Sequence, residues 1–273
     1  MPDLPNLTSR TVFVIGGASG LGAAVAKLAA KAGAFVVVFD IAAPETGKHH
    51  YVDLRNPLSV EHVVGQTDTK FDLLVNSAGL PAGAEPADIL NVNYLGQIQL
   101  AEALLANANH EARVFSIASI AGREWRSNRE IVTRLQTLRG PSETTAFCRT
   151  HGVDGKAAYR LSKAALIHWT RQMTNAYQDN RISFVSVSPG PVNTELFRKA
   201  TQASPQATAS LLAAAPRVAE PDEIADAILG LCRPEFGWLN GINIPLDGGA
   251  DARFDAQGIT MDILLNTQSE AQL

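Results

Sequence analysis

A tyrosine and a lysine, Tyr159 and Lys163, are the side chains of this chain whose spacing best suits proton transfer. They belong to the run Lys-Ala-Ala-Tyr-Arg-Leu-Ser-Lys-Ala-Ala-Leu, residues 156–166, whose composition favours a helix. A spacing of four residues puts both side chains on one face of a helix. A free phenol has a pKa of about 10, and a nearby ammonium group favours the phenolate and lowers that pKa. The pair is therefore a candidate general base, although surface helices often carry the same two residue types.

A glycine-rich turn near the start of the chain follows an apolar run, residues 11–16, that is typical of a buried parallel strand. The alanine-rich residues 23–32 come next and predict a helix. In this context the glycines let the backbone approach a pyrophosphate, which then binds at the helix N-terminus. A turn without a ligand is the alternative, and the strand that follows the helix favours the dinucleotide. The turn consists of Gly16, Gly17, Ala18, Ser19, Gly20, Leu21 and Gly22.

An aspartate ends that next strand and bears on the choice of dinucleotide. Asp40 lies 18 residues after Gly22, and an acid at about this separation binds the ribose hydroxyls of adenosine. The same carboxylate would repel the additional phosphate of NADP. Residues 41–43, Ile-Ala-Ala, provide no basic side chain for that phosphate. We therefore predict NAD, with a simple turn residue at the end of the strand as the alternative for Asp40.

Strand and helix patterns alternate along the whole chain. Strands are predicted at residues 34–39, 51–53, 71–75, 113–118, 181–188 and 241–245, and helices at residues 88–106 and 155–177. Alternation of this kind implies parallel strands with helices on both faces of the sheet. We expect one α/β domain over residues 1–273, with a Rossmann-type doubly wound parallel sheet and ligands at the carboxyl ends of its strands.

Seven blocks of sequence, taken in order, resemble those of the short-chain dehydrogenase/reductase family. The resemblance runs from about residue 10 to residue 250, and so many ordered blocks are highly specific together. The blocks are Gly16-x3-Gly20-x-Gly22, Leu74-Val-Asn-Ser-Ala-Gly79, Asn91-Val-Asn93-Tyr94, Ser116-Ile-Ala-Ser119, Tyr159-x3-Lys163, Ser188-Pro189-Gly190-Pro191-Val192-Asn193-Thr194 and Leu246-Asp-Gly-Gly249.

This resemblance implies a role for four catalytic residues. Tyr159 would be the general base, Ser119 would bind the substrate oxygen, and Lys163 would lower the Tyr159 pKa and hold the nicotinamide ribose. Asn93 would hold a water linked to Lys163. Asn93 could instead satisfy backbone groups, and Ser119 could be an ordinary strand-end serine. Ser116 is the alternative catalytic serine, but it falls inside a predicted strand. The cofactor-binding residues that it implies are Gly16, Ser19, Gly20, Leu21, Gly22, Asp40, Asp53, Leu54, Asn76, Ala78, Gly79, Tyr159, Lys163, Pro189, Gly190, Val192 and Thr194.

The chain departs from the family pattern mainly by an insert before the tyrosine helix. Ser119 and Tyr159 are 40 residues apart, and the additional segment is about residues 123–153. Helices are predicted at residues 129–138 and 142–150, separated by a Gly-Pro break. The insert should cover helices that commonly form a dimer interface in this family, so a homodimer through another surface is expected. The same insert resembles a bacterial subgroup that holds 3α-hydroxysteroid dehydrogenase/carbonyl reductase and coniferyl alcohol dehydrogenase.

Composition excludes several other classes of partner. The net charge of −4 gives no reason to expect nucleic acid or an anionic membrane, and no apolar run reaches about 18 residues. Cys148 and Cys232 are isolated, which predicts a reduced, cytoplasmic protein. No metal site is expected from the six histidines. The arginines of the insert are interpreted as a solvated helix face; they are Arg123, Arg126, Arg129 and Arg134.

The predicted function is NAD-dependent interconversion of a secondary or aryl alcohol and its carbonyl. A mobile loop over about residues 195–218 should form a substrate lid, and its apolar residues Leu196, Phe197 and Leu211 suit a hydrophobic alcohol or ketone such as a 3α-hydroxysteroid. A coniferyl-type alcohol is the alternative substrate. A non-catalytic NAD-binding sensor and non-redox chemistry on the same fold are the alternative functions. Residues 251–273 are interpreted as a C-terminal tail.

Overall fold

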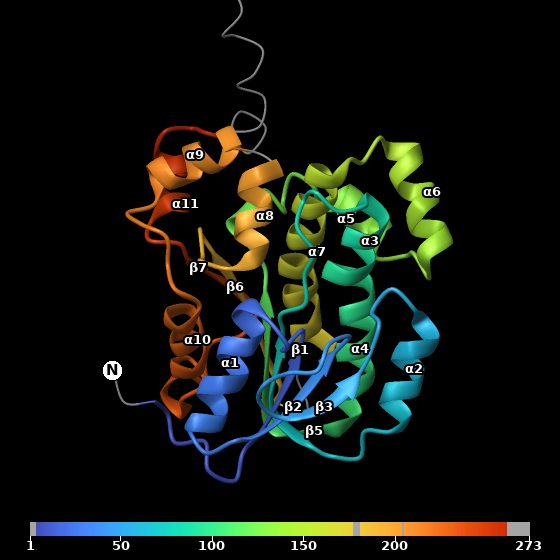
Figure 1. Cartoon of the computed structure of the whole chain (residues 1–273), viewed down its shortest axis with the longest axis vertical. Coiled ribbons are helices and arrows are strands. Elements are labelled where there is room, and N and C mark those ends of the chain that lie inside the picture. The colour runs from blue at the N-terminus through green and yellow to red at the C-terminus, as the bar shows by residue number, and fades with distance from the viewer. Residues whose placement is uncertain (1–3, 177–180, 204, 261–273) are drawn as a thin grey trace, which may run out of the picture.

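Parallel strands form one sheet at the centre of the molecule (Figure 1). In this computed structural model, which describes residues 4–176, 181–203 and 205–260, the strand order is β3-β2-β1-β4-β5-β6-β7. The order reverses between β1 and β4, and a crevice at the carboxyl ends of the strands is expected at such a reversal. The predicted doubly wound parallel sheet is confirmed. The strands are β1 Thr11–Ile15, β2 Phe35–Asp40, β3 Lys48–Tyr51, β4 Phe71–Asn76, β5 Ala108–Ile117, β6 Ser183–Pro189 and β7 Ile242–Leu246.

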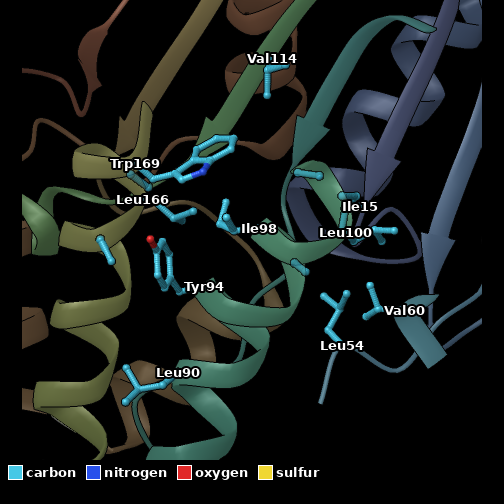
Figure 2. Packing of buried hydrophobic residues seen from close by; sticks show 14 of the residues in the cluster. Ile15, Leu54, Val60, Leu90, Tyr94, Ile98, Leu100, Val114, Leu166 and Trp169 are labelled. Atoms are coloured by element: carbon cyan, nitrogen blue, oxygen red, sulfur yellow. The ribbon is translucent and has the colours of Figure 1, made fainter. Parts of the chain in front are cut away.

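Helices cover both faces of the sheet because successive strand residues point to opposite sides. Phe13 and Ile15 of β1 pack into one hydrophobic cluster with α4 (Gln97–Leu104) and α7 (Gly155–Ala176). The close view of this cluster shows side chains from β1, α4 and α7 pointing toward one another (Figure 2). Val12 and Val14 point into the opposite cluster, under α1 and α10. These two helices, α1 Gly20–Lys31 and α10 Pro221–Gly230, pack against each other.

The third strand lies earlier than predicted. We expected residues 51–53, and the structure places β3 at Lys48–Tyr51. Its pairing with β2 ends where Asp40 faces Tyr51, and Val52 then turns into the core with 1% of its surface exposed. The sequence of the strand, Lys-His-His-Tyr, has no apolar run, so periodicity could not locate it.

The helix predicted at residues 88–106 is not uniform. It consists of α3 (Pro86–Leu90), a π-helical turn η1 (Asn91–Gly96), α4, and a short 3₁₀ turn η2 (Leu105–Asn107). In a π turn each N–H bonds the carbonyl five residues earlier, and such turns occur mostly as single turns at functional sites. Nothing in the residue pattern distinguishes this turn from ordinary helix.

Two further helical regions lie beyond the carboxyl ends of the strands (Figure 1). The insert forms α5 (Arg129–Leu135), which packs against α7, and α6 (Pro141–His151), which packs against α3. The segment expected to be a lid loop forms two helices instead, α8 (Glu195–Ala203) and α9 (Pro205–Ala214). Their alanine content and the proline that starts α9 favour helix over loop.

The segment expected to be a C-terminal tail starts as a helix. It begins within α11 (Ala250–Ala256), and residues 261–273 lie outside the described residues, as does residue 177 at the predicted end of the tyrosine helix. Two 3₁₀ turns complete the fold, η3 (Ile120–Gly122) and η4 (Pro234–Phe236). Among the helices that the structure describes, none is both apolar enough and long enough to cross a lipid bilayer.

Candidate active site

A cavity of about 570 Å³ opens at the carboxyl end of the sheet. Most of the sequence-predicted site residues line it, because they end or follow strands β1 to β6 or lie on α7. Gly22, Asn76 and Asn93 do not line it. The predicted residues that do are Gly16, Ser19, Gly20, Leu21, Asp40, Asp53, Leu54, Ala78, Gly79, Ser119, Tyr159, Lys163, Pro189, Gly190, Val192 and Thr194.

Gly22 and Asn76 support the cavity from behind. A Cβ at Gly22 would lie 1.9 Å from the carbonyl oxygen of Gly16, so only glycine lets α1 pack beneath the turn. Asn76 is fully buried and donates to the hydroxyl of Ser116 (3.1 Å), which is within β5 as expected. Both residues shape the site from outside the cavity, and their predicted role in cofactor binding stays a prediction.

The glycine turn is built to admit an anion. Gly16 has φ +81°, and a Cβ there would lie 2.4 Å from the Ala78 Cα. Ser19 precedes the first residue of α1, and within the described chain its side chain makes no capping hydrogen bond to the helix. The first N–H groups of a helix have no partner inside the helix and carry partial positive charge. This uncapped N-terminus fits the pyrophosphate of a dinucleotide.

Acidic side chains lie at the other side of this turn. The Asp40 carboxylate accepts from the N–H of Ala18 (2.9 Å) and from the N–H of Ala42 (3.0 Å), so it braces the glycine turn as well as facing the cavity. Asp53 accepts two hydrogen bonds from the Arg55 guanidinium, and these hold the pKa of that carboxyl below its usual value. Asp40 therefore remains the acid available to a bound ribose.

Ser119, Tyr159 and Lys163 converge in the middle of the cavity. Ser119 hydrogen-bonds Tyr159 and also accepts from the N–H of Ala121 (3.2 Å) at the start of η3. The Lys163 Nζ donates to the carbonyl of Ile117 (2.8 Å) and lies 5.8 Å from the centre of the Tyr159 ring. Helical spacing thus places phenol and ammonium on one side of α7, as the sequence predicted.

Burial is the largest influence on the pKa values of Tyr159 and Lys163. Burial raises the pKa of Tyr159, and the hydrogen bond with Ser119 opposes that rise. Burial also lowers the pKa of Lys163 to about 8, because the ammonium loses its water. The Lys163 Nζ is directed at the Ile117 carbonyl, so its effect on the Tyr159 pKa stays a prediction. The hydrogen bond with Ser119 is the contact that lowers the Tyr159 pKa here.

Asn93 lies behind the cavity, within the π-helical turn η1. Its side chain accepts from the N–H of Leu80 (2.6 Å) and donates to the carbonyl of the same residue (3.0 Å). A Cβ on Gly79 would be 3.9 Å from Asn93 Oδ1 and 4.0 Å from Lys163 Nζ, so the amide and the ammonium flank the same glycine. Asn93 therefore satisfies backbone groups, the alternative left open by the sequence, and does so beside Lys163.

An apolar wall closes the cavity opposite the acidic end. It is formed by side chains from α8, α9 and α11 and from the loop after β4, so the lid segment does face the site. Sequence reasoning missed Phe254, which is 3% exposed and packs with Ile120 and Leu211. Its signal was weak, a single phenylalanine in a segment interpreted as a tail. The apolar wall consists of Leu80, Leu196, Phe197, Leu211 and Phe254.

Arg123 holds this wall in place and corrects a second expectation. We interpreted it as part of a solvated helix face, but its side chain is 10% exposed. It forms ion pairs with Asp251 and Asp255, donates to the carbonyl of Ile259 (2.8 Å), and lies over the Phe254 ring. The two aspartates lie four residues apart on one face of α11, and this spacing in the sequence could have indicated that they bind a basic side chain.

No three His, Cys, Asp or Glu side chains gather as metal ligands in the portion of the chain that the structure describes. The expectation of a site without metal stays a prediction.

Comparison with known proteins gives a consistent result. A sequence profile described as short chain dehydrogenase matches residues 10–130, and one described as Enoyl-(Acyl carrier protein) reductase matches residues 143–251. The interval between the two matches falls inside the insert. The chain is 32% identical to the coniferyl-alcohol dehydrogenase of Pseudomonas sp. (strain HR199 / DSM 7063), over 89% of this chain and 97% of that protein.

Two hydroxysteroid dehydrogenases are also similar. The 3-alpha-hydroxysteroid dehydrogenase/carbonyl reductase of Comamonas testosteroni is 28% identical, over 89% of this chain and 97% of that protein. The crystal structure of the 3-alpha-hydroxysteroid dehydrogenase from Pseudomonas sp. B-0831 complexed with NADH superposes with a TM-score of 0.78. That match has 26% identity and covers 90% of this chain and 99% of the other.

Proposed function

Because the chain belongs to the short-chain dehydrogenase/reductase family, we propose that it is an NAD-dependent oxidoreductase that interconverts a hydrophobic alcohol and its carbonyl compound. The substrate class we favour is a secondary alcohol such as a 3α-hydroxysteroid. The observation that carries the proposal is the meeting of Ser119, Tyr159 and Lys163 in one cavity. That cavity has an uncapped helix N-terminus on one side and an apolar wall on the other.

Tyr159, Ser119 and Lys163 each have a different role in the proposed reaction. When bound, a nicotinamide cofactor would supply the hydride acceptor for alcohol oxidation and the hydride donor for carbonyl reduction. Tyr159 takes the hydroxyl proton of the alcohol, and Ser119 hydrogen-bonds the same substrate oxygen and stabilises its charge. Lys163, held at the Ile117 carbonyl, places a cation beside the phenol and can bind a ribose hydroxyl. In carbonyl reduction Tyr159 donates the proton instead.

NAD rather than NADP is supported by Asp40. Its carboxylate is held by two backbone N–H groups at the edge of the cavity, and each oxygen keeps a lone pair for a ribose hydroxyl. A phosphate on that ribose would meet this charge directly. Gly16, Gly20 and the first turn of α1 are proposed to bind the pyrophosphate.

The Asp40→Asn variant tests the cofactor choice. It keeps the shape of the side chain but removes its charge and replaces one of the two accepting oxygens with an amide donor. We expect the ratio of kcat/KM with NAD to kcat/KM with NADP to fall about tenfold or more, equivalent to about 1.4 kcal/mol. Steady-state kinetics with both cofactors measure it, and Asp68→Asn, at an exposed acid, is the control. An unchanged ratio in Asp40→Asn contradicts the assignment.

The apolar wall predicts how the protein selects its substrate. Phe254→Ala should raise KM for a rigid steroid about tenfold and change kcat/KM for a small ketone much less, because only the large ligand reaches that ring. Phe236→Ala, at an exposed phenylalanine, should change neither. Equal losses for both substrates would show that Phe254 stabilises the fold rather than the ligand.

An absorbance assay of reduced cofactor tests the function as a whole. Purified protein is incubated with NAD or NADP and with 3α-hydroxysteroids, coniferyl-type aryl alcohols or short aliphatic alcohols, and the matching ketones and aldehydes are tested in reverse. The coniferyl-type alcohol is the second candidate substrate, favoured by the 32% identity to the coniferyl-alcohol dehydrogenase. Cofactor binding without turnover of any of these compounds would instead support an NAD-binding sensor. The homodimer and the cytoplasmic location stay predictions.

A further inference from the structure

The insert contacts the π-helical turn η1 immediately before Asn93. The Thr144 hydroxyl of α6 donates to the side-chain Oδ1 of Asn91 (2.9 Å), and both residues are buried. Its oxygen also lies 3.0 Å from the Gly140 carbonyl, so the two acceptors share one hydroxyl proton. A buried side-chain hydrogen bond across 53 residues of sequence joins the insert to the turn that carries Asn93.

A second contact reaches the turn immediately after Asn93. The Gln136 side chain, which follows α5, donates to the phenol oxygen of Tyr94 (2.9 Å). The second proton of the same amide is donated to Oε1 of Gln172 on α7 (2.6 Å). One side chain of the insert therefore connects the π-helical turn to the helix that carries the catalytic tyrosine and lysine. Figure 2 shows Tyr94 pointing from its turn toward α7.

The π-helical turn η1 is a geometry that contacts with neighbouring elements can stabilise. A π turn is uncommon, and regular α-helical hydrogen bonding would rotate the residues after Asn91 relative to those before it. Asn93 would then lose its two hydrogen bonds with Leu80. Because Gly79 precedes Leu80 and lies between Asn93 and Lys163, that loop forms the immediate surroundings of the ammonium.

We propose that the insert is a strut of the active site, in which Thr144 and Gln136 are positioning residues that hold the π-helical turn against the tyrosine helix. They keep Asn93 on the Leu80 backbone and so fix the loop that surrounds Lys163. The catalytic part of this inference rests on the proposed function. The mechanical part concerns hydrogen bonds of the free protein and does not.

Thr144→Val tests the strut by removing one hydroxyl without changing the size of the side chain. Hydrogen exchange of the Leu80 N–H, read by NMR, is expected to become about tenfold faster, because its acceptor Asn93 is held less firmly. Thr145→Val is the matched control: Thr145 is the next residue of α6, is exposed, and donates only within its own helix. Thr144→Ser, which restores the hydroxyl, should return the exchange rate to that of the natural protein.

The kinetic arm follows alcohol oxidation against pH. In Thr144→Val we expect kcat to fall about fivefold or more, since small displacements of a catalytic group are costly. The pH profile of kcat should shift by about half a unit, because displacement of the loop beside Lys163 and Tyr159 changes the burial that sets their pKa values. Cofactor affinity, measured by fluorescence, should stay within about twofold. Gln136→Met, at a half-buried position, provides a second variant if Thr144→Val does not fold.

The outcomes separate the two proposals. Leu80 exchange that is as slow in Thr144→Val and Gln136→Met as in the natural protein overturns the strut. Faster exchange with unchanged kcat and an unchanged pH profile overturns its catalytic role. If the natural protein turns over none of the alcohols, the proposed function fails, and the exchange measurement still decides whether the insert holds the turn.

Discussion

Replacing Tyr159 with phenylalanine is expected to lower kcat for alcohol oxidation by about 10²–10⁴-fold, the usual contribution of a general acid or base. The variant removes a single oxygen. The ring keeps its packing, and the glycine turn, Asp40 and Lys163 are untouched, so cofactor affinity should change by no more than about twofold. Steady-state formation of reduced cofactor gives kcat, and fluorescence titration gives the affinity for cofactor.

Tyr51→Phe is the matched control for this experiment. Tyr51 is 59% exposed at the end of β3, so losing its hydroxyl should leave both measurements unchanged. Turnover by Tyr159→Phe at the natural rate would refute Tyr159 as the base and would direct attention to Ser119. A loss of cofactor binding together with turnover would mean that the phenol holds the nucleotide rather than the proton.

Replacing Lys163 with methionine is expected to abolish turnover and yet leave the free protein no less stable. Burial lowers the Lys163 pKa from 10.5 to about 8, which corresponds to about 3 kcal/mol at about 1.4 kcal/mol per pKa unit. Methionine removes that cost but leaves the Ile117 carbonyl without its donor, a loss of about 1–3 kcal/mol. The free energy of unfolding at neutral pH should therefore stay equal or rise by about 1 kcal/mol. Activity should fall at least about 10²-fold.

The pH dependence of stability provides the decisive measurement for Lys163. Between pH 8 and pH 10.5 the unfolded chain still binds the lysine proton while the folded protein has released it. Stability contributed by this group therefore rises with pH across that window. Urea unfolding at several pH values should show this rise in the natural protein and not in Lys163→Met. Lys70→Met, at an exposed lysine, should retain it; a flat profile in all three proteins would show that Lys163 is not desolvated.

Much of the site could be predicted from sequence because its signals are local. The glycine turn, Asp40 at the end of a strand and the four-residue spacing of Tyr159 and Lys163 each depend on a few neighbouring residues. Parallel strands then bring their carboxyl ends to one edge without further information. The insert could also be predicted, because the long spacing between Ser119 and Tyr159 and the Gly-Pro break are features of the sequence alone.

What could not be predicted depends on contacts between distant segments. Arg123 is buried only because α11, more than a hundred residues later, supplies two carboxylates. β3 is a strand because β2 offers it an edge, although its own residues are polar. The lowered pKa of Lys163 follows from burial by several elements at once, and a helical spacing says nothing about burial. The same is true of the π turn at Asn93, which the insert supports from a distance.

The cavity is lined by residues from both the early and the late parts of the described chain. The glycine turn and Asp40 are made early in synthesis, whereas Phe254 and its partners on α11 are among the last described residues. A chain that folds while it is synthesised therefore forms its glycine turn long before α11 can add Phe254 to the apolar wall.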